Sequence, residues 1–158
     1  MVSKYGMGAM LLGALALCGG CADTGGGSQT SRAAAAAPAA KSLYDRLGGK
    51  PAITAVVDQF VANVAADQRI NGRFATTDIP KLKGHLVNQV CGATGGPCNY
   101  TGRDMKATHD GMKITGADFN ALVQNLVAAL DKFNVPAGEK GELLALLGPM
   151  KKDIVELP

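Results

Sequence analysis

Apolar residues recur at helical intervals along this chain from residue 53 onward. The first stripe runs from residue 53 to residue 64, with members spaced i, i+3, i+4, i+7, i+8 and i+11, which places them on one face of an α-helix. The members are Ile53, Val56, Val57, Phe60, Val61 and Val64. No alternation of apolar and polar residues competes with this spacing, so the sequence predicts an all-α fold.

Four further stripes predict more helical segments. Their members are Ile79, Leu82, Leu86 and Val90, with His85 on the same face; Met105, His109 and Met112; Phe119, Leu122, Val123, Leu126, Val127 and Leu130; and Leu143, Leu147, Met150 and Ile154. A short helix is also expected near residues 43–47 and a turn near residues 69–74.

Proline, glycine and aspartate indicate where the helices begin and end. Pro51 and Pro80 suit the first turns of two helices, and Asp78 is the expected N-cap of the second. The remaining breaks are Gly48-Gly49, a loop over residues 92–102, Val135-Pro136, and Gly148-Pro149, which is expected to kink the last helix.

The first 21 residues have the pattern of an export signal. Lys4 is followed by an apolar run over residues 7–17, which is shorter than the roughly 20 residues that a membrane-spanning helix needs. The run ends before Gly20-Cys21, which resembles a bacterial lipoprotein processing site. We expect an exported protein on the periplasmic side, anchored to the membrane by a lipid on Cys21. Lipidation of Cys18 and a plain secretory signal are the alternatives.

Residues 22–41 consist mainly of Gly, Ala, Ser and Thr, a composition that cannot bury a core and is typical of a flexible tether. The remaining residues, 42–158, suffice for one small domain. The net charge is only +3, and the chain has four Phe, three Tyr and no Trp. Since the basic residues are also scattered, the sequence does not favour a nucleic-acid partner.

Cys91 and Cys98 remain in the predicted domain, separated by a short loop rich in Gly and Pro. An exported protein meets an oxidising compartment, where such a pair can form a disulfide. The alternative is two free thiols that pack as small apolar groups.

The chain has only two histidines, His85 and His109, amid much aliphatic surface. This inventory suits a protein that holds a metal cofactor in an apolar pocket and supplies an axial ligand. Zinc bound by both histidines, Cys91 and Cys98 is a weaker alternative, because the spacings lack the usual close pairs. Hydrolase motifs are missing from the sequence, where Ser42 is the only serine after the tether.

Several motifs occur in an order and spacing that together are distinctive. They are Leu43-Tyr44-Asp45-Arg46-Leu47-Gly48-Gly49, Phe74, Gly95-Gly96, Gly102-Arg103-Asp104-Met105 followed by His109, and Val135-Pro136. On these residues the segment 42–158 resembles the group I truncated haemoglobins over nearly its whole length. The resemblance implies a two-over-two helical sandwich around a b-type haem, with His109 as the proximal iron ligand. The cofactor-binding residues that it implies are Phe60, Val61, Phe74, Leu82, His85, Leu86, Arg103 and Met105.

The ligand side departs from the family pattern. Val61 stands where the family usually has a tyrosine, and Leu82 and Leu86 stand where it often has glutamine. His85 is the one polar group left there, and it either ligates the iron or contacts a haem propionate. The other propionate candidates are Lys81, Lys83 and Arg103.

Two functions follow from this resemblance. The first is a haem protein that binds oxygen or another diatomic gas, such as nitric oxide or carbon monoxide. The alternative is a haem redox protein that oxidises nitric oxide, reduces peroxide or transfers electrons, with an unidentified reductase as partner. A helical lipoprotein without haem is a third possibility, which His109 and the glycine motifs disfavour.

Overall fold

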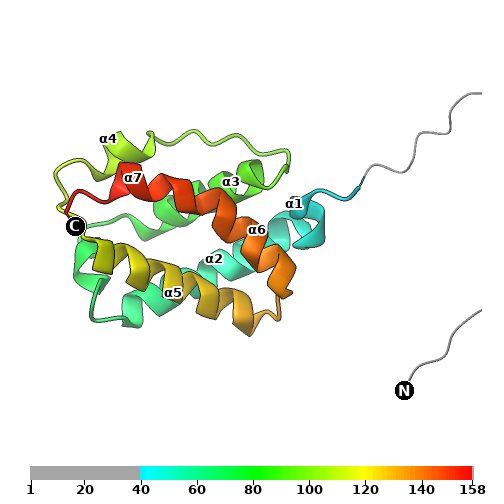
Figure 1. The fold of residues 1–158 in the computed structure, drawn as a ribbon, viewed down its shortest axis with the longest axis horizontal. Helices are drawn as coiled ribbons and strands as arrows, with labels where there is room; N and C mark the ends of the chain where they lie inside the picture. The colour runs from blue at the N-terminus through cyan, green and yellow to red at the C-terminus, as the bar shows by residue number, and fades with distance from the viewer. Residues whose placement is uncertain (1–39, 158) are drawn as a thin grey trace, which may run out of the picture. The chain divides into compact units, whose positions relative to one another are not determined.

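The computed structural model describes residues 40–157, so the predicted signal and nearly all of the tether lie outside the described residues. The helices are α1 (Leu43–Arg46), α2 (Gly49–Ala66), the 3-10 turn η1 (Asn71–Phe74), α3 (Ile79–Ala93), α4 (Met105–His109), α5 (Gly116–Lys132), α6 (Ala137–Leu147), the 3-10 turn η2 (Gly148–Met150) and α7 (Lys151–Ile154) (Figure 1). The all-α prediction is confirmed. No helix within residues 40–157 is both long and apolar enough to cross a membrane.

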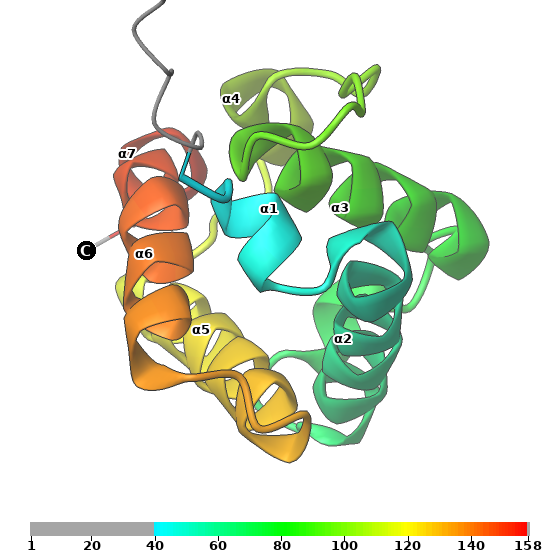
Figure 2. The same ribbon diagram turned by 90° about the vertical axis from the view of Figure 1, so that its right-hand side faces the viewer.

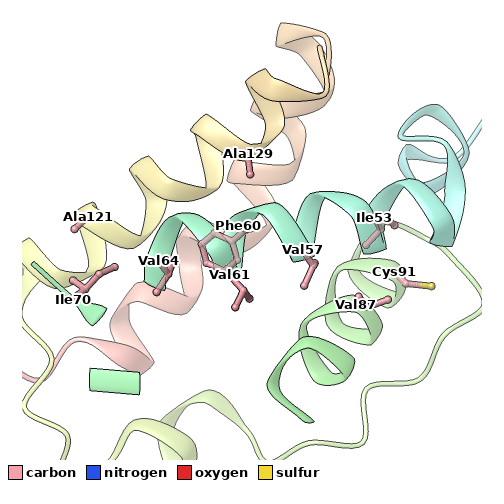
Figure 3. Packing of buried hydrophobic residues seen from close by; sticks show 10 residues of the cluster. All are labelled: Ile53, Val57, Phe60, Val61, Val64, Ile70, Val87, Cys91, Ala121 and Ala129. Atoms are coloured by element: carbon pink, nitrogen blue, oxygen red, sulfur yellow. The ribbon is translucent and has the colours of Figure 1, made fainter. Parts of the chain in front are cut away.

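Helix α2 is the centre of the packing, because it lies against both α3 and α5, while α4 lies against α7 (Figure 2). The buried cluster in Figure 3 takes its members from these central helices and from the turn before η1: Ile53, Val57, Phe60, Val61, Val64, Ile70, Val87, Cys91, Ala121 and Ala129. Each large apolar side chain buried here stabilises the fold by about 1.5–3 kcal/mol relative to an exposed one. The stripe predicted over residues 53–64 is therefore the core of the domain.

Side-chain caps fix the starts of α3 and α4. The carboxylate of Asp78 accepts from the Lys81 amide at 3.0 Å, which confirms the N-cap predicted for α3. Asp104 caps α4 in the same way at the Ala107 amide, at 2.8 Å. Such caps satisfy amides that have no partner within the helix and contribute about 1 kcal/mol each.

Two helix ends differ from the sequence prediction. Helix α4 ends at His109, so Met112 does not share its helical face as predicted. The physical reason is the backbone that follows, where Gly111 has φ +77° and Lys113 has φ +53°, neither of which continues a helix. Helix α3 continues to Ala93, two residues into the predicted loop. The predicted kink at Gly148-Pro149 is confirmed, because η2 separates α6 from α7 there.

The second glycine pair allows a close approach between α1 and the end of α3. Gly95 has φ +86°, and a Cβ on Gly96 would lie 2.4 Å from the Tyr44 ring and 2.7 Å from Sγ of Cys91. The Tyr44 amide also donates to the carbonyl of Thr94 at 2.9 Å. Only glycine fits at position 96, because any side chain would push α1 off this corner.

Candidate functional site

His109 is the last residue of α4, and the helix itself orients its half-buried ring. Nδ1 donates to the carbonyl oxygen of Met105, one turn earlier, at 2.7 Å. A carbonyl can only accept, so Nδ1 carries the proton and Nε2 keeps its lone pair. This is the arrangement in which a neutral histidine is oriented to ligate a metal.

His109 lines a pocket that is partly open to solvent. Its other lining residues are contributed by η1 and its preceding turn, the segment after α4, α5 and α7: Ile70, Arg73, Phe74, Met112, Ile114, Asp118, Phe119, Leu122 and Ile154. Seven of these nine are apolar. An apolar wall with one free imidazole nitrogen fits a haem, whose ring needs hydrocarbon contact and whose iron needs an axial ligand.

Arg73 and Asp118 are the two charged residues in this lining, and they bind each other at 2.7 Å. The amide and the hydroxyl of Thr115 also donate to the carboxylate of Asp118, at 2.9 and 2.8 Å. These bonds, with the Arg73 guanidinium as a smaller contribution, hold the pKa of Asp118 below its usual value. The sequence analysis missed both residues, and the only signal for Arg73 was its position next to Phe74.

One polar side chain of α3 reaches α4 and η2. Gln89, one turn beyond His85, places its amide nitrogen 3.1 Å from the sulfur of Met150 and 3.8 Å from that of Met105. Thioether sulfur is a weak acceptor, so the Gln89 amide retains donor capacity here. The sequence analysis missed Gln89 although its spacing from His85 was visible.

The structure brings only some of the predicted site residues together. Phe74 and His109 line the same pocket, and Met105 holds the His109 ring. The predicted ligand-side residues are not among those that line this pocket: Phe60 and Val61 are buried in the core cluster, and Leu82 and His85 are half-buried on α3. Leu86 packs against that cluster, as do Phe74 and Leu122 of the pocket.

The three propionate candidates have different surroundings. Lys83 is 2.8 Å from the carboxylate of Asp58 on α2, so its charge is already paired. Lys81 and Arg103 are exposed. Pairing with Asp58 leaves Lys83 the least available of the three for another carboxylate.

Cys91 and Cys98 are joined by a disulfide in the structure, with their Cα atoms 5.7 Å apart. The bond ties the end of α3 to the loop that leads to α4. Residues 40–157 contain no group of three or more His, Cys, Asp or Glu side chains that could hold a metal ion. The four residues of the zinc alternative therefore do not converge on one point.

Comparison with known proteins identifies clear relatives. The family model described as bacterial-like globin matches residues 42–156. The chain is 38% identical over 113 residues to the group 1 truncated hemoglobin GlbN of Mycolicibacterium paratuberculosis, covering 72% of this chain and 83% of the relative. It is 35% identical to GlbN of a Nostoc species, covering 72% of this chain and 97% of the relative.

Solved structures give the same match at the level of the fold. Truncated hemoglobin from Tetrahymena pyriformis superposes with a TM-score of 0.70 at 30% identity, covering 73% of this chain and 98% of the other. The 2/2 hemoglobin from Synechococcus, solved in the cyanomet state with covalently attached heme, gives a TM-score of 0.69 at 33% identity with the same coverage.

Proposed function

Because the chain belongs to the bacterial-like globins, as a group I truncated haemoglobin with an iron-containing haem cofactor, we propose that it holds the haem through His109 and binds a diatomic gas. The haem iron supplies the gas-binding chemistry, and the protein supplies an axial nitrogen and an apolar environment. One observation carries the proposal: Nδ1 of His109 is engaged by the Met105 carbonyl at 2.7 Å, which leaves Nε2 for the iron.

The surrounding side chains support this role in two ways. Phe74, Phe119 and Leu122 line the pocket beside His109 with hydrocarbon. The Met105 carbonyl selects the tautomer with the proton on Nδ1 and fixes the rotation of the ring, so little freedom remains to be lost when a metal binds.

Paired histidine variants test the assignment. We expect His109→Ala, produced with haem supplied, to lose most of its Soret absorbance, and added imidazole to restore part of it by occupying the vacated space. His85→Ala removes the other histidine of the chain and is the matched control, which should keep its haem. Full Soret absorbance with an unchanged spectrum in His109→Ala would refute the assignment.

The second candidate function is haem redox chemistry, and the apolar residues Val61, Leu82 and Leu86 favour it only by weakening its rival, tight oxygen binding. Bound dioxygen is partly anionic and gains from hydrogen-bond donors, whereas nitric oxide and carbon monoxide depend on them less. A pocket without the tyrosine and glutamine donors thus discriminates less strongly for oxygen. Turnover of nitric oxide by the oxygenated protein with a supplied reductant, faster than that of free haem, would select this function over simple gas binding.

The location of the domain forms a separate part of the proposal. We propose that the domain is exported and tethered to the membrane through a lipid on Cys21. The support is the apolar run over residues 7–17, the Gly20-Cys21 pair and the Gly- and Ala-rich segment that follows. Gas binding by residues 42–158 does not depend on this anchor.

A further inference from the structure

Arg73 connects η1 to the corner of the chain that follows His109. One guanidinium nitrogen donates to the carbonyl of Met112 at 2.7 Å. The other donates to the Asp118 carboxylate at 2.7 Å and to the Lys113 carbonyl at 3.4 Å. A single side chain therefore bridges segments about 40 residues apart in sequence.

The corner that Arg73 holds is connected directly to the proposed iron ligand. The amide of Met112 donates to the carbonyl of His109 at 3.0 Å. Two hydrogen bonds thus lead from the guanidinium to the Met112 carbonyl and from the Met112 amide to the His109 carbonyl, so the backbone of Met112 links them. A shift of the corner would move the end of α4, and the His109 ring with it.

The backbone of this corner needs external support. Lys113 adopts φ +53°, a left-handed conformation that a non-glycine residue adopts at a cost of order 1 kcal/mol. The carboxylate of Glu156 accepts from the amides of Gly111 and Lys113 and holds the corner from the C-terminal side. Arg73 holds the same segment through the carbonyls of Met112 and Lys113.

The position of Arg73 favours a strong interaction. Its side chain is 32% exposed and that of Asp118 is 16% exposed, so water screens the pair less than it screens a surface salt bridge. The planar guanidinium can serve several acceptors at fixed angles, which the single ammonium of lysine cannot do. Thr115 holds Asp118 in place through its amide and hydroxyl.

We propose that Arg73 is a positioning residue for His109. By holding the corner that follows α4, at residues 110–114, it fixes the orientation of the imidazole that bonds the haem iron. This inference rests on the proposed function, because it takes His109 as the ligand. Arg73 borders the same pocket as His109, but its hydrogen bonds go to the protein backbone and to Asp118.

The test compares Arg73→Met with a matched control, Arg69→Met. Arg69 lies four residues earlier and binds Asp67 and Gln124, neither of which belongs to the corner after α4. The first readout is amide hydrogen exchange over residues 110–114, measured in both the haem-free and the haem-loaded protein. The second is the iron–histidine stretching band of the ferrous protein in resonance Raman spectra.

We expect Arg73→Met to speed exchange in the corner by about tenfold, the equivalent of one lost hydrogen bond, and to shift or broaden the iron–histidine band. Arg69→Met should change neither readout. Arg73→Lys, which keeps the charge and is the milder variant if Arg73→Met folds poorly, should recover only part of the wild-type behaviour. Amide exchange over residues 110–114 at the wild-type rate, together with an unchanged iron–histidine band, in Arg73→Met or Arg73→Lys would overturn the inference. The ligand assignment fails on a different result, the Soret absorbance of His109→Ala, so the two failures are distinguishable.

Discussion

The ring of Tyr100 packs edge-on against the ring of His85, with centroids 5.9 Å apart and an interplanar angle of 65°. The Tyr100 hydroxyl donates to the carbonyl of Arg103 at 2.8 Å, which fixes the tyrosine on the loop before α4. Tyr100 is itself 36% exposed. His85 thus packs on a ring that reaches the surface, and we propose that it contacts a haem propionate and does not ligate the iron.

Tyr100→Ala tests whether this contact keeps His85 from the iron. We expect the ferrous wild type to be five-coordinate and His85→Ala to leave its spectrum and its oxygen release nearly unchanged. Removing the Tyr100 ring frees His85, so the six-coordinate fraction in the visible spectrum should rise. Tyr100→Phe, which keeps the ring, is the control. A six-coordinate wild type that His85→Ala converts to a five-coordinate or water-bound form would show that His85 is a ligand.

The Cys91–Cys98 disulfide predicts a redox-dependent stability. Closing a loop of about eight residues stabilises the fold by roughly 2.5 kcal/mol in the chain-entropy model. We expect a reductant to lower the melting temperature of the wild type and to leave the Cys91→Ser/Cys98→Ser double variant unaffected. Mass spectrometry of alkylated, non-reduced protein checks the bond directly, and two alkylated thiols would contradict it.

The sequence predicts those parts of the fold that depend on neighbours in the chain. The stripe containing Phe60 and Val61, the Asp78 cap and the break at Gly148-Pro149 all follow from spacing within one helix or turn, so periodicity and capping rules suffice. The order of the glycine and histidine motifs then gives the family.

The features of the fold and of the site that could not be predicted from the sequence depend on contacts between distant segments. Arg73 meets Met112 and Asp118 across 39 and 45 residues, and no local pattern marks such a pair. Gln89 meets Met150 across 61 residues. The early end of α4 depends on left-handed backbone after His109, which the glycine at 111 permits but does not require.

Lipidation of Cys21 is testable by metabolic labelling in a bacterial host. A labelled fatty acid should enter the wild type and fail to enter Cys21→Ser, because the thioether that carries the lipid needs the Cys21 sulfur. Cys18→Ser is the matched control and should stay labelled. Label that persists in Cys21→Ser would move the anchor to Cys18, and no label in the wild type would indicate a plain secretory signal.

The ionisation of Asp67 should contribute to the pH dependence of folding stability. Its carboxylate accepts hydrogen bonds from Arg69 and, at 2.7 Å, from Asn125 on α5, and these bonds hold its pKa well below the usual value, with Arg69 as the largest cause. A pKa that is lower in the folded state stabilises the fold above the ordinary value of about 4. This stabilisation is lost as the pH falls from that value through the lowered pKa.

Urea unfolding of Asp67→Asn at pH 7, 5 and 3 checks this relationship. The variant should be less stable than the wild type at pH 7, and the difference should narrow at pH 3, where the wild-type carboxylate is already mostly protonated in the unfolded chain. The acid dependence should not vanish, because the pKa of Asp118 is also lowered. Asp153→Asn, on the exposed surface of α7, is the control. A constant difference between Asp67→Asn and wild type at all three pH values would contradict the assignment.

Val61 offers the most direct test of an apolar ligand side. Its side chain is 8% exposed within the core cluster and cannot donate a hydrogen bond. A hydrogen bond to charged or partly charged oxygen is worth roughly 1.5–3 kcal/mol, or about one to two decades in affinity. We therefore expect the wild type to release oxygen faster than relatives that have tyrosine at this position, and Val61→Tyr to slow that release.

Val61→Phe separates the hydroxyl from the bulk of the ring. Both aromatic variants overpack the core, at a cost of about 1–3 kcal/mol in folding free energy. The stability of each variant should therefore be measured alongside its stopped-flow rate of oxygen release. Release from Val61→Tyr should be at least about tenfold slower than from Val61→Phe, since the two differ only in the donor. Equal rates would show that position 61 does not face the gas. Slow release in the wild type that His85→Ala accelerates strongly would instead identify His85 as the donor and end the case for an apolar pocket.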